Sequence, residues 1–254
     1  MPLPLEFYDK LAGVYEHRDH LDVARAFFAR LSGELDALEE GAPVLDLACG
    51  SGVLSELVLA RGLRVLGVDL SKPMLARARK RCARFGRRAR FLRGDLRRFR
   101  APRPAACAAA SGDIVNHLPR RSLRPVFRNV GRNLRAGGFL AFEAHRRFCY
   151  EEYWSERTYH METEGGDLVM ECDWDGEREL ATARMIGYLR ERGGSYRKVE
   201  ATLREHYHPE RELRAALREA GFKGIRHEPW SPWSDQHLEP DIDRTWWIAR
   251  RPGT

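Results

Sequence analysis

The sequence predicts an α/β fold in which helices cover both faces of a mostly parallel sheet and an antiparallel sheet is inserted near the end. Two apolar runs, VLDLACGSG at 44–52 and VLGVDLS at 65–71, are separated by about the length of one helix. Continuous valine and leucine are typical of buried parallel strands. Beyond residue 143 the chain changes to short alternating runs divided by glycine turns, which indicate antiparallel strands.

Residues 41–71 make the first strand–helix–strand unit of this fold. Gly50 and Gly52 follow the strand that carries Asp46, and glycine lets a turn bring its backbone against a ligand. The free N–H groups at the start of the next helix suit a carboxylate or another polar group. Asp69 ends the second strand, where a carboxylate can hold both hydroxyls of a ribose. The unit therefore predicts a nucleoside-binding site.

The glycine spacing excludes two common nucleotide sites. The run Gly50-Ser-Gly-Val-Leu supplies no third glycine for the GxGxxG of a dinucleotide site. The chain also has no GxxxxGK[ST] loop, which argues against a triphosphate site.

The other core elements follow in order along the chain. Apolar residues on a 3.6-residue period predict a helix from Leu5 to about Leu38, and Ser71 caps a later helix. Two strands, a helix and the start of a fifth strand are predicted at 89–92, 104–110, 121–134 and Gly137-Gly138. The strand at 104–110, PAACAAA, has poor β-propensity and is predicted from its position between well-marked neighbours.

Aromatic residues concentrate after the fifth strand, since all six tryptophans and six of the eight tyrosines lie beyond residue 149. Alternating runs between 150 and 207 predict three to five antiparallel strands. A helix at 209–220 and closing strands at 222–227 and 245–249 follow. These patterns divide the chain into an N-terminal helical cap (1–40), a core (41–145), an inserted lid sheet (146–207) and a closing segment (208–254).

The motif D-x-A-x-G-x-G at 46–52 resembles motif I of the class I S-adenosylmethionine (SAM) methyltransferases, with Ala48 in place of the first glycine. The resemblance continues in the correct order through GVDLS, Gly94-Asp95-Leu96, Ser111-Gly112-Asp113 and LRAGGFLAFE at 134–143. It implies a seven-stranded, mostly parallel sheet, SAM as the cofactor and S-adenosylhomocysteine (SAH) as the product. The aromatic-rich insertion is similar to the lid sheet of small-molecule N-methyltransferases, including amino-sugar and glycine methylating enzymes.

The resemblance also implies roles for individual residues at the cofactor. Asp69 would accept hydrogen bonds from the ribose hydroxyls, Asp95 from the adenine amino group, and Asp46 would approach the methionine ammonium. Met74 and Leu96 would pack against the adenine, although such residues also fill cores. The remaining predicted cofactor contacts are Tyr15, Ala48, Gly50, Gly52, Leu70, Ser111 and Asn116.

Two histidines are the candidate catalytic residues. His117 lies just past the fourth strand and His145 follows the fifth, so both belong to the carboxyl edge of the predicted sheet. Either could act as a general base, or could be an ordinary satisfied polar residue. A hydroxyl acceptor would need such a base, whereas a neutral amine would not. The family resemblance slightly favours methyl transfer to nitrogen over oxygen.

The distribution of charged residues along the chain is compatible with more than one function and partner. Residues 77–103 hold thirteen Arg or Lys and one acid, whereas residues 145–191 hold twelve acids and six bases. The basic segment could be a nucleic-acid face of a tRNA or rRNA methyltransferase. It could also be an ordinary solvated face, because only five of the 44 basic residues are lysine. A dimer that pairs the two faces is a third interpretation, and a SAM-binding protein without catalysis is a further alternative.

The cysteine pattern and the lengths of the apolar runs restrict where the protein is expected to work. The five cysteines form no CxxC pair, which predicts a reduced cytoplasmic protein with no metal site. No apolar run reaches the ~18 residues of a membrane span, and the first ten residues do not resemble a signal peptide. We therefore expect a small-molecule partner, no membrane association, and a monomer or homodimer.

Overall fold

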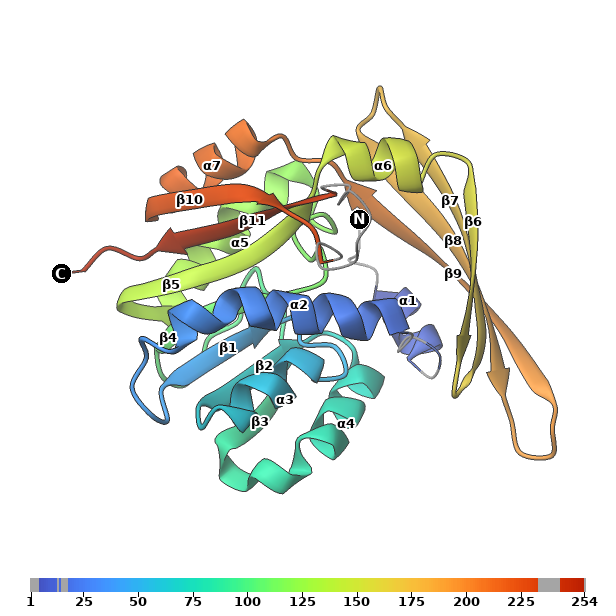
Figure 1. Ribbon diagram of the computed structural model, residues 1–254, viewed down its shortest axis with the longest axis horizontal. Helices are drawn as coiled ribbons and strands as arrows, with labels where there is room; N and C mark the ends of the chain where they lie inside the picture. The colour runs from blue at the N-terminus through green and yellow to red at the C-terminus, as the bar shows by residue number, and fades with distance from the viewer. Residues whose placement is uncertain (1–4, 13, 15–17, 233–242, 254) are drawn as a thin grey trace.

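The computed structural model describes residues 5–12, 14, 18–232 and 243–253. Two sheets are formed (Figure 1): a seven-stranded sheet in the order β10-β11-β5-β4-β1-β2-β3 and a four-stranded sheet in the order β6-β7-β8-β9. In the larger sheet β3, β2, β1, β4 and β5 are parallel, while β11 is antiparallel to both neighbours. The predicted seven-stranded, mostly parallel sheet with an inserted antiparallel sheet is confirmed.

The elements of the core alternate along the chain. Its strands are β1 (Pro43–Leu47), β2 (Arg64–Asp69), β3 (Ala89–Arg93), β4 (Ala105–Ala110), β5 (Leu134–His145), β10 (Lys223–Trp230) and β11 (Arg244–Arg250). Its helices are α2 (Arg18–Leu35), α3 (Val53–Ala60), α4 (Lys72–Arg81), the 3-10 helix η1 (Ala83–Arg88), α5 (Arg120–Asn133) and α7 (Glu210–Glu219). Apolar residues of α2, α3 and α4 pack on one face of the sheet, and those of α5 and α7 pack on the other.

The alanine-rich segment does form the central strand β4, and all six of its residues are buried. It lies between β1 and β5, where large aromatic side chains cover both faces of the sheet. On one face Phe142 stacks on Trp247, with ring centroids 5.7 Å apart, and on the other Phe27 contacts Trp246 at 4.7 Å. Small side chains in β4 leave room for these rings, so packing overrides the poor β-propensity of alanine.

The prediction of one helix from Leu5 to about Leu38 is wrong. The structure has two helices, α1 (Leu5–Leu11) and α2, with Val14 in a turn between them. Leu11 and Val14 are buried in the apolar cluster of the smaller sheet, whereas Phe27 of α2 is buried in the core of the larger sheet. Because the two helices serve different cores, the chain changes direction between them.

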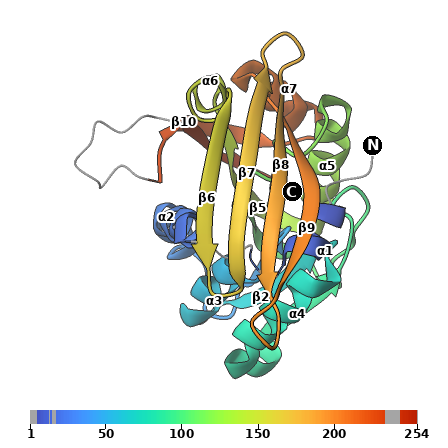
Figure 2. The same ribbon diagram turned by 90° about the vertical axis from the view of Figure 1, so that its right-hand side faces the viewer.

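The smaller sheet is made of β6 (Arg157–Thr163), β7 (Gly166–Asp175), β8 (Leu180–Arg190) and β9 (Tyr196–His206), joined to β5 through α6 (Arg147–Tyr153). Its four strands agree with the predicted three to five. Figure 2 shows this sheet in front of the core. The chain leaves the core through α6 to form this sheet and returns to the core at α7. We call the smaller sheet the lid sheet. Of the helices in the described residues, none is long and apolar enough to span a membrane.

Gly67 in β2 offers a test of how tightly the sheet packs around the site. A Cβ at this position would lie 2.5 Å from Phe91 Cδ1 and 2.8 Å from Cys49 Sγ. We expect Gly67→Ala to lower the free energy of unfolding by about 2 kcal/mol, because overpacking typically costs 1–3 kcal/mol. Chemical denaturation measures this change. Gly33→Ala in α2, where no atom lies within 4 Å of the new Cβ, should instead be neutral or stabilising.

Candidate functional site

A cavity opens at the carboxyl ends of β1, β2, β3 and β4, the edge at which α/β sheets bind ligands. The loop after β4 adds His117 and Leu118, and α1 adds Tyr8 from above. The cavity is lined by Tyr8, Ala24, Asp46, Ala48, Cys49, Gly50, Val53, Leu54, Val68, Asp69, Leu70, Ser71, Gly94, Asp95, Leu96, Arg97, Ser111, Gly112, Ile114, His117 and Leu118.

The loop after β1 owes its shape to left-handed backbone conformations. Ala48, Gly50 and Gly52 have φ of 52°, 51° and 85°. Ala48 takes a conformation that glycine adopts more easily, which explains why glycine is usual at this place in the motif. Nothing lies within 4 Å of a Cβ built on Gly50, so this glycine leaves the cavity open beside its backbone.

Gly52 and Met74, predicted at the cofactor, do not line the cavity. A Cβ on Gly52 would lie 3.0 Å from Cα and Cβ of Ala78, so the glycine allows α3 and α4 to approach closely. Met74 is a buried residue of α4, and its backbone N–H donates to Ser71 Oγ. Tyr15 lies outside the described residues.

Asp69 is held by both neighbouring loops. Its Oδ2 accepts a hydrogen bond from the Gly50 N–H at 2.9 Å, and its Oδ1 accepts one from the Ser71 N–H at 2.8 Å. Ser71 Oγ in turn donates to Asp9 of α1 at 2.7 Å. These contacts fix the carboxylate at the cavity wall and tie the N-terminal helix to the site. Each oxygen of Asp69 keeps further acceptor capacity for a ligand.

Asp95 is engaged by a neighbour on its own loop. Both of its oxygens accept hydrogen bonds from the Arg97 side chain, at 2.6 to 3.0 Å, and Oδ1 also accepts the Arg97 N–H. These hydrogen bonds hold the pKa of Asp95 below its ordinary value. Arg97 was not among the predicted site residues, although it lies two positions after Asp95.

The opposite end of the cavity carries a histidine between an acid and a phenol. His117 Nε2 lies 3.2 Å from Asp113 Oδ1 and 3.1 Å from the Tyr8 hydroxyl. Asp113 has a φ of 55°, which is strained for a residue with a side chain and is often found at functional sites. Asp113 belongs to the Ser111-Gly112-Asp113 motif, but no sequence signal indicates that it meets His117.

His145 is predicted beside His117 but lies behind the cavity wall. Its Nδ1 bonds Glu205 Oε2 at 2.9 Å, and its Nε2 lies 3.7 Å from Asp113 Oδ2. Glu205 is on β9, so the lid sheet contributes a buried carboxylate to the core. Glu205 also accepts a hydrogen bond from the Tyr150 hydroxyl at 3.0 Å. Asp113 thus stands between the two histidines.

Asn116, another predicted cofactor residue, does not line the cavity and joins three elements instead. Its Oδ1 accepts from the His145 N–H at 3.0 Å, and its Nδ2 donates to the carbonyl of His206 on the lid sheet. The His206 N–H donates back to the Asn116 carbonyl at 2.7 Å. Asn116 therefore fixes His145 and the lid strand β9 relative to each other.

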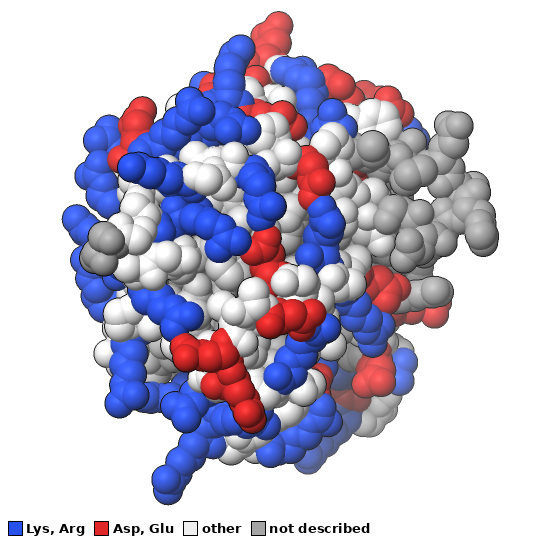
Figure 3. Space-filling view, turned by 60° about the vertical axis from the view of Figure 1, so that its left-hand side comes forward, with Lys and Arg blue, Asp and Glu red and all other residues white. Residues whose placement is uncertain are grey.

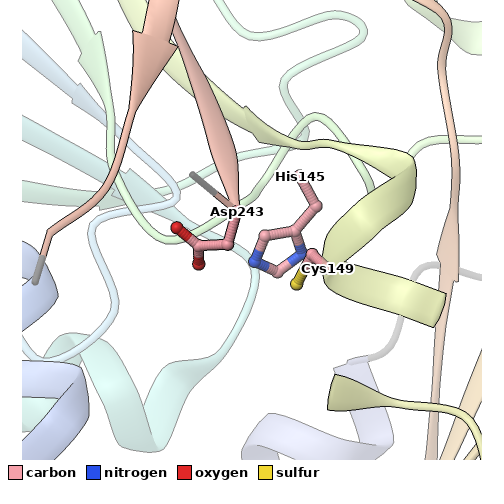
Figure 4. Close-up of side chains that lie close together, drawn as sticks. All are labelled: His145, Cys149 and Asp243. Carbon is pink, nitrogen blue, oxygen red and sulfur yellow. The ribbon is translucent and has the colours of Figure 1, made fainter. Parts of the chain in front are cut away.

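Metal-ligating side chains also gather here. His145, Cys149 and Asp243 form one buried group (Figure 4), and Asp113, His117 and Glu205 form a second. In Figure 4 the imidazole of His145 lies between the Cys149 sulfur and the Asp243 carboxylate. Arg244 already places a guanidinium 3.2 Å from Asp243. That the protein has no metal site remains a prediction from the pattern of its cysteines.

Buried charges around Asp113 set the protonation of the histidines. Burial opposes the charged form of His117, but the hydrogen bond and charge of Asp113 outweigh it and raise its pKa. Burial likewise opposes protonation of His145, yet the neighbouring Cys149 sulfur and Glu205 carboxylate raise its pKa well above the ordinary value. Although burial opposes its ionisation, both histidines and Arg244 lower the pKa of Asp113 to about 2. The cluster therefore favours an ionised Asp113 next to protonated imidazoles.

Comparisons with known proteins agree with this geometry. Residues 44–138 match a family model described as a methyltransferase domain. The chain is 25% identical over 222 residues to the methyltransferase-like protein YqeM of Bacillus subtilis, covering 86% of this chain and 87% of that one. Residues 44–138 are thus a methyltransferase domain, within a chain that has the fold of the class I SAM-dependent methyltransferases. Members of this family take their methyl group from SAM.

Solved structures share the fold across nearly the whole length of this methyltransferase. A SAM-dependent methyltransferase from Clostridium acetobutylicum superposes with a TM-score of 0.75 at 19% identity, covering 98% of this chain and 97% of that one. CalS10, an amino pentose methyltransferase from Micromonospora echinaspora, superposes with a TM-score of 0.63 at 22% identity, covering 94% and 93%. The inserted lid sheet is therefore part of the shared architecture.

The residues of the methyltransferase cavity fit SAM. Asp69 offers free acceptor capacity where a ribose would lie, and Asp95 lies at the start of the loop after β3. Gly50 and Gly112 leave space that a Cβ would fill, since no atom lies within 4 Å of either position. The predicted cofactor residues that line the cavity are Asp46, Ala48, Gly50, Asp69, Leu70, Asp95, Leu96 and Ser111.

Asp46 should make cofactor binding depend on pH. Burial raises its pKa to about 7, against a hydrogen bond from Ser55 Oγ at 2.5 Å. Below pH 7 the carboxyl is mostly neutral and cannot pair with an ammonium group, whereas above pH 7 it is ionised. We therefore expect SAH affinity to rise about tenfold between pH 6 and pH 8, in proportion to the ionised fraction. Calorimetric titration of SAH across this range, with Asp46→Asn as the pH-independent control, measures the effect. A flat wild-type profile would contradict it.

Proposed function

We propose that this methyltransferase transfers its methyl group to a small-molecule acceptor, at nitrogen in preference to oxygen. The observation that carries the proposal is the buried cluster in which an ionised Asp113 stands between His117 and His145 at one end of the cavity. The amino pentose methyltransferase CalS10, which shares the core and lid architecture, supports the same acceptor class.

Charge is the reason for preferring nitrogen. SAM supplies an activated methyl group carried on a sulfonium. When an amine accepts a methyl group, its nitrogen becomes positively charged, and the fixed carboxylate of Asp113 would stabilise that charge. A hydroxyl acceptor would instead need a base to take its proton. Neighbouring acidic groups raise the pKa values of His117 and His145, which favours the protonated rings over the neutral form that a base requires.

Enclosure supports a small acceptor. Tyr8 of α1 reaches over the cavity to His117, and Glu205 of the lid sheet reaches the same cluster from the other side. Residues that close over a site hold the acceptor in line with the reacting group and exclude water. The cap (1–40), core (41–145), lid (146–207) and closing segment (208–254) remain our proposed divisions of the chain.

A macromolecular RNA acceptor is the less favoured alternative. Several arginines of residues 77–103 serve the fold: Arg79 donates to the Phe91 carbonyl, Arg88 to that of Leu59, and Arg93 to that of Leu70. These contacts support the interpretation of the segment as an ordinary helix and strand surface. The cytoplasmic location and the choice between monomer and homodimer stay predictions.

The decisive experiment joins binding and turnover. SAM and SAH are titrated by calorimetry, and SAH release is then followed with a panel of amino sugars, amino acids, other small amines and their hydroxyl analogues. We expect both nucleosides to bind and amines to be methylated faster than matched hydroxyl compounds. Binding without turnover on any acceptor, or turnover only on RNA, would overturn the proposal. Full turnover in the double variant His117→Ala, His145→Ala would show that neither histidine is needed as a base.

A further inference from the structure

The outer side of α5 carries a regular row of arginines. Arg120, Arg124, Arg128 and Arg132 recur at every fourth position, and the helix contains no acidic residue. Residues four apart lie on the same side of a helix, where like charges destabilise it. α5 therefore keeps a charge pattern that its own stability opposes, which points to a use for the row. Figure 3 shows how widely basic side chains spread over one face of the protein.

This row lines a surface groove. The lining consists of six arginines with one proline and one asparagine: Arg97, Arg120, Arg121, Arg124, Pro125, Arg128, Asn129 and Arg132. Carboxylates at the edge neutralise two of them, since Arg120 pairs with Glu179 and Glu212, and Arg124 pairs with Glu219.

Three arginines of the groove keep their charge available. In the parts of the chain that the structure describes, no carboxylate forms an ion pair with Arg121, Arg128 or Arg132. A second hollow continues from the groove and shares Arg128 and Arg132 with it, adding Arg251. The available positive charge thus follows the length of α5, which matches a ligand that carries several negative charges in a row.

Arg97 connects the groove to the cofactor cavity, because it lines both. Its guanidinium holds both oxygens of Asp95, the residue that we assign to the adenine amino group. If the Arg97 guanidinium turned into the groove instead, the Asp95 carboxylate would become free to accept hydrogen bonds from a ligand in the cavity. Arg97 is half-exposed, at 46% of its side-chain surface, so it has room to move.

We propose that the groove binds a ligand with two or more consecutive phosphate groups, and that its occupation tightens cofactor binding through Arg97. The guanidinium group of arginine can donate two parallel hydrogen bonds to the oxygens of one phosphate group. Several neighbouring guanidinium groups without a carboxylate partner therefore suit a chain of phosphates. Phosphate competes with Asp95 for Arg97, so Asp95 is freed to accept the adenine amino group. The coupling is reciprocal, because the cofactor then favours the state in which Arg97 lies in the groove. This step rests on the assignment of Asp95.

Calorimetry with tripolyphosphate tests the groove first, in the absence of cofactor and at constant ionic strength. Arg128→Ala, which touches no cofactor residue, should weaken tripolyphosphate binding about tenfold and leave SAH affinity without phosphate unchanged. Arg192→Ala on the exposed β8–β9 turn is the charge-matched control and should change neither. Equal tripolyphosphate affinity in the wild type and Arg128→Ala would overturn the proposal that the groove binds phosphate groups.

SAH titration with and without saturating tripolyphosphate then tests the coupling. We expect SAH to bind about five- to tenfold more tightly with tripolyphosphate. In Arg97→Ala the SAH affinity should be raised already and should no longer respond to phosphate. An unchanged wild-type affinity would overturn the coupling. A complete lack of SAH binding would refute the cofactor assignment instead, and the groove measurement would stand by itself.

Competition separates two sources of the phosphate chain. Displacement of tripolyphosphate by ATP identifies a free nucleotide as the ligand class. Displacement by short single-stranded RNA, with an affinity that falls linearly on logarithmic axes as salt rises, identifies a nucleic-acid backbone. Failure of both to compete would overturn the proposal that phosphate chains are the ligand.

Discussion

Replacing Asp69 with alanine is expected to weaken SAH binding about 100-fold. In our assignment this carboxylate accepts hydrogen bonds from both ribose hydroxyls, and hydrogen bonds to charged groups contribute about 1.5–3 kcal/mol each. A total of about 3 kcal/mol corresponds to about 100-fold in affinity. The substitution also removes the acceptors for the Gly50 and Ser71 N–H groups, so the loops after β1 and β2 lose their common anchor.

Two measurements together identify the cause of that loss. Calorimetry gives the SAH affinity, and thermal unfolding without ligand shows whether the protein is still folded. Asp173→Ala, an exposed aspartate on the lid strand β7, serves as the control and should bind SAH like the wild type. If the Asp69→Ala protein is folded and binds SAH normally, the ribose assignment is wrong.

Asp113→Asn is expected to lower kcat about 100-fold while SAH affinity changes less than threefold. Asparagine keeps the shape of the side chain but removes the charge that would stabilise a cationic product nitrogen. Loss of one preorganised electrostatic contact typically costs about 100- to 1,000-fold in kcat. The same change removes the partner that raises the pKa of His117, so that pKa should fall. Histidine titration by NMR reads this shift independently of turnover.

The control for this experiment is Asp173→Asn, which changes an exposed aspartate in the same way. Turnover is measured with the best acceptor found in the panel. Unchanged kcat in Asp113→Asn would contradict a role for this carboxylate in methyl transfer. A large loss of SAH affinity would instead indicate that Asp113 serves the cofactor side of the cavity.

Much of the fold and of the cofactor end could be predicted from the sequence because the signals there are local. A continuous apolar strand, a glycine turn and an acidic residue at the next strand end lie within 30 residues, and β1 and β2 pair directly. Asp46, Gly50 and Asp69 therefore line one cavity, as their spacing predicts. Ala48 shows how the backbone, with its φ of 52°, keeps the shape of the motif without the first glycine.

The acceptor end could not be predicted in the same way. Asp113 and Glu205 are 92 positions apart and meet around His145 only because the lid sheet returns to the core at β9. Glu205 gives no local signal, since it lies within an alternating strand among many exposed charges. The position of Asn116 after β4 predicts a cavity residue, yet its side-chain amide forms hydrogen bonds to the backbone of β5 and β9.

Buried strands and glycine turns leave periodic, short-range patterns, so the sheet, the lid and much of the cofactor end could be predicted from the amino-acid sequence. Which polar residues share a buried space depends on how distant segments pack together. The charge of Asp113, the protonation of His117 and His145, and the hold of Arg97 on Asp95 depend on burial and on distances of a few ångströms. Those quantities exist only after the chain has folded, because water screens such charges from one another in the unfolded state.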